Sequence, residues 1–280
     1  MNAEHLPLHG VRVVSLAMNL PGPLATARLV RMGAAVVKVE HPSGDPLRAI
    51  DPDWYEALSA GQEVIALDLK SREGIDDLHE LLGSADLLLT ATRPAALRRL
   101  GLSWSELRER HPRLSQVAIV GHPPPAENHP GHDLTYQAAA GLLTGRDLPV
   151  LPLADLAGAE RASTECLVTL VHRGATGTGC RREVALAEVC FDFAEPLRRR
   201  MLTQGGPLGG ESAYYRIYGT RHGQVALAAV ERHFRERIDA LLGLGDPAVS
   251  LADVFATRTA SEWADWAERH DLPLVAVRDL

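Results

Sequence analysis

The sequence has little cysteine and no disulfide or metal pattern. Its 280 residues include three cysteines, and these (Cys166, Cys180 and Cys190) are an odd number without C-x-x-C spacing. Disulfide frameworks need paired cysteines and zinc sites need clustered ones, so the sequence indicates buried or incidental thiols in a reducing compartment. Histidines such as His122 and His129 also lack ligand spacing, and we expect no metal site.

Long apolar runs are missing as well. No stretch approaches the roughly 20 apolar residues that span a bilayer, and the N-terminus has no basic-then-apolar signal pattern. The formal net charge of -7 disfavours a general binder of nucleic acid or membrane surfaces, although a local basic pocket for a phosphorylated ligand remains compatible with it. We therefore expect a cytoplasmic protein whose partners are neither nucleic acid nor membrane.

Several nucleotide-binding and catalytic signatures are absent. The turn Asn19-Leu20-Pro21-Gly22-Pro23 lacks the G-x-G-x-x-G spacing that brings a backbone close to a pyrophosphate, although Glu40 stands where a ribose-binding acid belongs. The sequence contains no P-loop, no G-x-S-x-G elbow and no H-E-x-x-H motif. It therefore disfavours a nicotinamide-dependent enzyme.

What the sequence does contain is an alternation of apolar runs and helical patterns. Strands are predicted at residues 11–16, 35–40, 64–69, 86–90, 114–120 and 182–186, and helices at 24–32, 72–82 and 159–172. Ser103 and Glu106 form a capping-box pair that opens a further short helix. Strand–helix–strand units imply a parallel sheet, so the fold class is α/β.

The composition changes after about residue 205. A hairpin is predicted at residues 214–218 and 224–228, helices at 231–242, 251–256 and 261–270, and a last strand at 273–277. We therefore expect a large domain at residues 1–205 and a smaller α/β domain at residues 206–280.

Residues 130–158 carry the most distinctive chemistry. Gly131 ends a proline-rich turn, and His132 and Asp133 follow it directly. Asp155 returns after a short loop in an otherwise apolar run, so we expect its carboxyl group to be partly buried and to have a raised pKa or a specific role. A histidine and a carboxylate from neighbouring loops suit acid–base chemistry. The alternative is that His132 and Asp155 cap helices or pair with backbone.

Basic side chains gather near the predicted strand ends. They are Lys38, Lys70, Arg93, Arg98 and Arg99. Ligands of open α/β sheets bind beyond the carboxyl ends of the strands, and arginine and lysine suit phosphate groups there. Each residue alone fits a solvated charged surface equally well, but the set indicates an anionic cofactor.

Together these motifs resemble the class III CoA-transferase family (CaiB/BaiF), and within it the α-methylacyl-CoA racemase branch. The matching segments are residues 10–16, 21–23, 32–40, 67–70, 93–94, 99–102, 131–133, 154–155, 176–179, 214–215 and 229–231. Their order and spacing cover nearly the whole chain. The resemblance implies a Rossmann-like large domain, a smaller α/β domain, an interlocked homodimer and coenzyme A bound as an acyl-CoA thioester.

The resemblance also implies roles for individual residues. Contacts with the nucleotide end of CoA are implied for Lys38, Lys70, Arg93 and Arg99, and a lining of the passage to the thioester for Gly131, His132, Asp133 and Tyr136. Asp155 matches the family's catalytic aspartate, which attacks the thioester in transferases and exchanges a proton at C2 in racemases. His132 occupies the place of the racemase histidine, and Glu231 matches the glutamate that partners it.

Three departures from the family pattern bear on function. The motif Asn-x-Gly-Lys becomes Ser59-Ala60-Gly61-Gln62, the segment at residues 190–209 is shorter than usual, and the sequence ends at Leu280, before the family's return segment to the large domain. These departures motivate the hypothesis of a shortened, non-catalytic CoA-binding protein.

The main hypothesis is an acyl-CoA enzyme with racemase-like proton exchange at C2 of a 2-methylacyl-CoA. In this hypothesis His132 and Asp155 are the paired acid and base, and Glu231 orients His132. The alternative keeps the ligand and changes the chemistry: a CoA-transferase that moves CoA between carboxylic acids through an acyl-Asp155 intermediate. The acyl group itself is not determined by the sequence.

Overall fold

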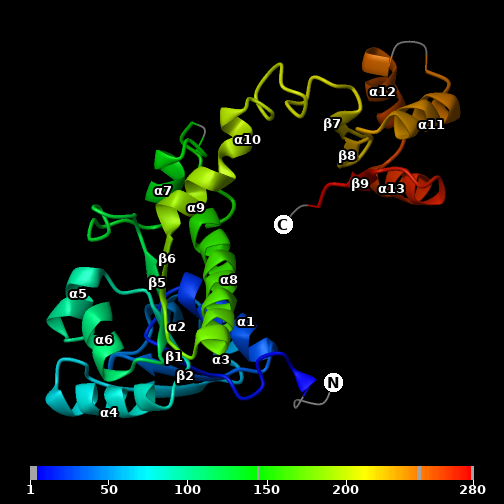
Figure 1. Ribbon diagram of the computed structural model, residues 1–280. Coiled ribbons are helices and arrows are strands. Elements are labelled where there is room, and N and C mark those ends of the chain that lie inside the picture. Colours follow the sequence, from blue (N-terminus) through cyan, green and yellow to red (C-terminus); the bar gives the residue numbers. More distant parts are fainter. Residues whose placement is uncertain (1–4, 144, 245–246, 279–280) are drawn as a thin grey trace. The chain divides into compact units, whose positions relative to one another are not determined.

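The first of two compact units is built on a six-stranded parallel sheet. The computed structural model describes residues 5–143, 145–244 and 247–278, and the chain divides into units at residues 1–194 and 195–280. In the first unit the strands lie in the order β3-β2-β1-β4-β5-β6 (Figure 1). They are β1 (Arg12–Ser15), β2 (Ala35–Glu40), β3 (Glu63–Ala66), β4 (Leu87–Thr90), β5 (Ser115–Val120) and β6 (Arg181–Ala185).

Helices cover both faces of this sheet. Its helices are α1 (Pro21–Arg31), α2 (Pro46–Ile50), α3 (Pro52–Ser59), α4 (Arg72–Gly83), α5 (Pro94–Arg99), α6 (Trp104–Arg110), α7 (Asp133–Ala139), α8 (Leu153–Thr176) and α9 (Leu186–Phe193). Successive strand residues point to opposite faces. Leu87 and Leu89 therefore pack in the core beneath α1 and α8, while Leu88 packs in the core beneath α4 to α6. All three leucines are fully buried, as strands covered on both faces require.

The second unit has a small antiparallel sheet with its own core. Strands β7 (Tyr215–Gly219), β8 (Gln224–Ala228) and β9 (Leu274–Ala276) pair in that order. The helices of this unit are α10 (Glu195–Arg198), α11 (Arg232–Leu242), α12 (Pro247–Phe255) and α13 (Ala260–Arg269). Phe255 and Trp263 stack edge to face in the core. The expected fold class, a Rossmann-like parallel sheet with a smaller α/β unit, is confirmed. No described helix is long and apolar enough to cross a membrane.

The structure departs from the sequence-based prediction at element ends. Helix α8 begins at Leu153 instead of residue 159, so Asp155 lies in its first helical turn and not in a loop. Helices α2 and α3 were not predicted from the sequence. Both are short and start at a proline behind an aspartate whose side chain caps the helix: Asp45 accepts from the Leu47 amide and Asp51 from the Trp54 amide. The units divide after Ala194, whereas the sequence predicted a boundary after residue 205.

The strand order creates a crevice at the carboxyl edge of the sheet. From β1, the strands β2 and β3 continue to one side, and β4, β5 and β6 continue to the other. The segments that follow β1 and β4 therefore leave the sheet in different directions. The strand order reverses between β1 and β4, and ligands of doubly wound folds bind at this switch point.

The close approach of α1 to the end of β1 gives a first prediction. A Cβ on Gly22 would lie 2.1 Å from Cβ of Ala17, whereas a Cβ on Gly174 in α8 would meet nothing within 4 Å. We expect Gly22→Ala to lower the free energy of unfolding by about 1–3 kcal/mol, because α1 must move. The matched helical control, Gly174→Ala, should raise it by about 0.5–1 kcal/mol. Urea denaturation of both variants measures this, and equal effects would contradict the close approach.

Candidate active site

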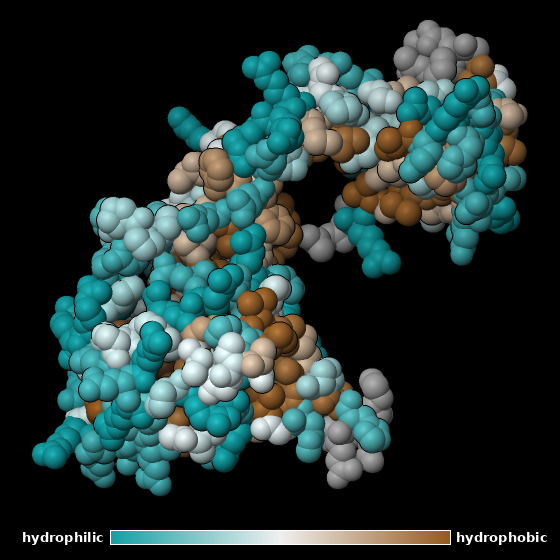
Figure 2. Space-filling model, viewed as in Figure 1, coloured by the Kyte–Doolittle hydropathy of each residue, from teal (hydrophilic) through white to brown (hydrophobic). Residues whose placement is uncertain are grey.

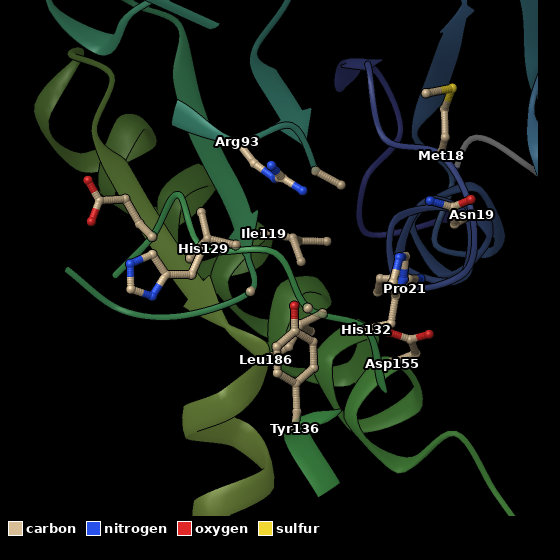
Figure 3. Close-up of a pocket in the computed structure, with 15 residues that line it drawn as sticks. Met18, Asn19, Pro21, Arg93, Ile119, His129, His132, Tyr136, Asp155 and Leu186 are labelled. Atoms are coloured by element: carbon tan, nitrogen blue, oxygen red, sulfur yellow. The ribbon is translucent and has the colours of Figure 1, made fainter. Parts of the chain in front are cut away.

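A cavity of about 210 Å³ lies at the carboxyl edge of the sheet, within the first unit. Its walls come from segments that follow four strands: Met18, Asn19 and Pro21 after β1, Arg93 after β4, residues 121–132 after β5, and Leu186 after β6 (Figure 3). Tyr136 and Asp155 complete it from α7 and α8. Five residues singled out in the sequence therefore line one cavity: Arg93, Gly131, His132, Tyr136 and Asp155.

His132 and Asp155 lie next to each other in this cavity (Figure 3). His132 precedes α7, and its backbone N–H donates to Oγ1 of Thr135 at 3.1 Å. Asp155 stands in the first turn of α8. Both residues thus lie at helix N-termini, but their side chains line the cavity.

A second carboxylate fixes the position of Asp155. The backbone N–H of Asp155 donates to Oδ1 of Asp133 at 3.2 Å, and Nε2 of Gln137 donates to Oδ2 of the same carboxylate at 2.6 Å. Nε2 of Gln137 also donates to the carbonyl oxygen of Leu151, immediately before α8. Asp133, for which the resemblance implied a lining role, therefore joins the N-termini of α7 and α8.

The surroundings of Asp155 shift its acidity toward neutral pH. Burial, followed by the negative charge of Asp133, raises the pKa of Asp155 to about 6, while His132 acts in the opposite sense. The positive end of the α8 dipole also favours the ionised form. At pH 7 Asp155 is mostly a carboxylate, yet a partly desolvated one. A poorly solvated carboxylate can act as a nucleophile or as a base.

Tyr136 forms one wall by packing against two glycines. Its side chain is buried, and a Cβ would lie 2.3 Å from its hydroxyl oxygen if built on Gly121 and 2.5 Å from its Cε1 if built on Gly131. His122 meets the ring edge to face at 5.2 Å. Burial and the nearby Asp155 raise the pKa of Tyr136, so it keeps its hydroxyl proton near pH 7. Gly121 was missed in the sequence, where a glycine directly after a predicted strand was the available signal.

The remaining predicted site residues lie outside this cavity. Lys70 lines a separate, mainly apolar cavity of about 160 Å³ with Leu67 and Leu97. Arg99 is exposed in the last turn of α5. Glu231 belongs to the second unit, where it is the exposed residue that precedes α11.

The structure encloses Lys38 among carboxylates. The resemblance implied a contact with CoA, but this side chain is 1% exposed. Its ammonium group forms ion pairs with Glu40 at 2.9 Å and Asp45 at 2.7 Å, and the hydroxyl group of Tyr55 donates to Glu40 at 2.7 Å. A phosphate could reach Lys38 only by displacing two carboxylates, because the chain after β2 folds back over the strand and encloses the ammonium.

Lys38 instead stabilises a wall of the cavity through Asp45. Asp45, which it neutralises, accepts a hydrogen bond from the backbone N–H of Asn19 at 3.1 Å. Asn19 lines the cavity and has a left-handed backbone conformation, with φ of 65°, which is uncommon outside glycine. The buried ion pair therefore holds the left-handed turn at Asn19 in the cavity wall.

Comparisons with known proteins agree with this architecture. Residues 8–280 match the model of CoA-transferase family III. The chain is 26% identical to the probable fatty acyl-CoA transferase Rv3272 of Mycobacterium tuberculosis, over 98% of this chain and 86% of that protein. It is 30% identical to the succinyl-CoA–L-malate CoA-transferase alpha subunit of Chloroflexus aurantiacus, over 69% of this chain and half (50%) of that protein. The crystal structure of Rv3272 superposes with a TM-score of 0.82, at 26% identity, covering 98% of this chain and 84% of that one.

The enclosure of Lys38 predicts a large effect on stability. We expect Lys38→Met to lower the free energy of unfolding by about 3–5 kcal/mol, because it leaves Glu40 and Asp45 buried without their cation. The control Lys70→Met removes an exposed ammonium and should change it little. Chemical denaturation at pH 7 measures both variants, and similar small effects would contradict the buried ion pair.

The raised pKa of Asp155 predicts a pH-dependent gain of stability on its removal. A carboxyl group whose folded-state pKa exceeds its unfolded value stabilises the fold below the unfolded pKa and loses that contribution as the pH rises through the folded pKa, here from about 4 to about 6. Asp155→Asn should therefore raise the free energy of unfolding by about 2–3 kcal/mol at pH 7.5, with the difference disappearing near pH 4. The exposed control Asp147→Asn should show no such trend; a pH-independent effect of Asp155→Asn would exclude the raised pKa.

Proposed function

The chain belongs to CoA-transferase family III, and we propose that it moves CoA from an acyl-CoA thioester to an acceptor carboxylic acid with Asp155 as nucleophile. The observation that carries the proposal is the cavity at the switch point of the sheet, in which a partly buried carboxylate with a pKa of about 6 stands beside His132. Partial desolvation makes that carboxylate more reactive than one in water.

In the first step a carboxylate oxygen of Asp155 attacks the thioester carbonyl carbon. The C–S bond breaks, CoA leaves as a thiolate and a mixed anhydride forms on Asp155. The thiolate then attacks the aspartyl carbonyl, which releases the first acid and leaves CoA as a thioester on Asp155. The acceptor carboxylate repeats the two steps in reverse and departs as the new acyl-CoA. Water is neither consumed nor released, so a cavity that limits access of water protects both intermediates.

The other cavity residues suit supporting roles. The Tyr136 hydroxyl and the His132 ring can donate hydrogen bonds to negative charge that develops on the carbonyl oxygen. Arg93 is exposed and lines the same cavity, where its guanidinium can hold an anionic group. Lys70 and Arg99 are retained as contacts for the nucleotide end of CoA, whereas the enclosed Lys38 is not. The role that the resemblance implied for Glu231 stays a prediction.

Racemase-like proton exchange, the main hypothesis from the sequence, is now the second candidate. Its support is the position of His132 beside Asp155 in one cavity. The two curated relatives described above are named as CoA-transferases, which favours transfer. Neither the geometry of the cavity nor the names of these relatives favours a non-catalytic CoA-binding role.

A homodimer is part of the proposal. Helices α8 and α9 leave large apolar side chains exposed, among them Val168, Val171, Phe191 and Phe193, and Figure 2 shows hydrophobic atoms gathered alongside α8. Extended apolar surface of this kind is typical of a protein–protein interface.

Hydroxylamine trapping tests the proposed chemistry. An acyl-Asp155 anhydride or thioester should yield an aspartyl hydroxamate at Asp155 during turnover with an acyl-CoA and an acceptor acid, detectable by mass spectrometry of the peptide. Asp155→Ala should abolish the adduct and lower kcat by roughly 10³-fold or more, whereas Asp147→Ala should do neither. Exchange of the C2 proton with deuterated water, without any hydroxamate or acyl transfer, would replace this proposal with the racemase-like candidate.

A further inference from the structure

A second and larger cavity, of about 450 Å³, lies on the face of the sheet covered by α5 and α6. Gln116 and Ala118 of β5 and their register partners Arg181 and Glu183 of β6 form its floor. Val117 and Ile119, which alternate with these two β5 residues, pack in the core beneath α8. Because successive strand residues point to opposite faces, Gln116 and Ala118 point to the other face of the sheet. The roof comes from α5, the start of α6 and the loop after β5. The proposed CoA-transfer chemistry uses none of this cavity's floor.

Two buried side-chain oxygens without a hydrogen-bond partner line this cavity, and a third lies on the same face of the sheet. They are Oε1 of Gln116, Oε2 of Glu127 and Oγ1 of Thr90, none of which meets a donor or acceptor among the described residues. Gln116 is 1% exposed and Thr90 is fully buried. Gln116 and Glu127 line the cavity, and Thr90 pairs in register with Ala118, which places it on the same face of the sheet. An unpaired buried polar atom destabilises a fold by about 1–3 kcal/mol, so the two that line the cavity indicate a ligand.

The charges around the cavity specify the chemistry of that ligand. The two side chains that line the cavity offer unpaired acceptor oxygens, one of them anionic, and no described cation forms an ion pair with Glu127. A primary ammonium group supplies three N–H donors and the positive charge that a buried carboxylate oxygen requires. Trp104 lines the same cavity, and an indole ring also attracts a cation.

The rim of the cavity suits an anion. Arg98 is exposed and lines the cavity, and its guanidinium group forms no ion pair or hydrogen bond with another described residue. Arg181 is already neutralised by Glu183. A metal ion fits less well, because the described residues contain no group of three or more histidine, cysteine, aspartate or glutamate side chains able to hold one.

We propose that this cavity binds a small zwitterion of the amino-acid class, with its ammonium group at Gln116 and Glu127 and its carboxylate at Arg98. Glu127 also lines the catalytic cavity. The bound ammonium therefore changes the charge that this shared wall presents to the acyl group.

Isothermal titration calorimetry on the whole chain tests the proposal. The probes are the proteinogenic amino acids, their N-acetyl derivatives and the decarboxylated amines. We expect at least one amino acid to bind, its N-acetyl derivative to bind at least about tenfold more weakly, and its amine to bind with intermediate affinity. Arg98→Gln should weaken binding of the amino acid and leave that of the amine unchanged. No binding by any amino acid, or equal binding of the N-acetyl derivative, would overturn the proposal.

A matched pair of buried threonines separates ligand binding from folding. The hydroxyl group of Thr169 donates to the Cys166 carbonyl oxygen at 2.8 Å, whereas that of Thr90 has no described partner. Thr90→Val should therefore leave the empty protein as stable as the parent or more so, as should Gln116→Leu, and Gln116→Leu should weaken amino-acid binding at least about tenfold. Thr169→Val should destabilise the fold and leave binding intact. If Gln116→Leu destabilises the empty protein as much as Thr169→Val does, or leaves amino-acid binding unchanged, the site is not an ammonium site.

Discussion

The hydrogen bond from the Asp155 amide to the Asp133 carboxylate is the interaction on which the site depends. It joins the first turns of two helices, and among the described residues of the two loops before them there is no helix or strand. The same carboxylate that positions Asp155 also raises its pKa by charge repulsion. One contact therefore sets the place of the proposed nucleophile and, together with burial, its acidity, and the parallel sheet supplies the edge at which the contact forms.

Much of the fold could be predicted from local sequence, because its signals are local. The valine-rich strand at residues 35–40 is confirmed at both ends, and the capping box of Ser103 and Glu106 forms as expected. The hairpin of β7 and β8 follows from alternation around a short turn. The start of α8 was missed because Pro152 provides no side-chain cap, which leaves Asp155 in the first turn as a weaker start signal. Local patterns fail where a helix end is set by tertiary contacts.

The site was predictable where topology alone brings residues together, and unpredictable where packing decides. Arg93 and His132 follow adjacent strands, and a doubly wound sheet places both segments at one edge. The burial of Lys38 could not be predicted, because it depends on Asp45 and Tyr55 returning across the strand from segments with no local link to it. The reaction could not be predicted from the sequence either. A histidine beside an aspartate is compatible with proton exchange and with acyl transfer, and only the names of the relatives favour transfer.

The packing of Tyr136 against Gly121 and Gly131 constrains how this enzyme can diverge. Even one methyl group on either glycine would overlap the Tyr136 side chain. Substitution of these glycines therefore cannot adjust the width of the cavity on that side in small steps. Under the proposed function, a change in the size of the acyl group would therefore be accommodated on the other walls, for example at Met18, Asn19 and Leu186. Among descendants of this chain, these three positions should diversify while the tyrosine and its two glycines stay together.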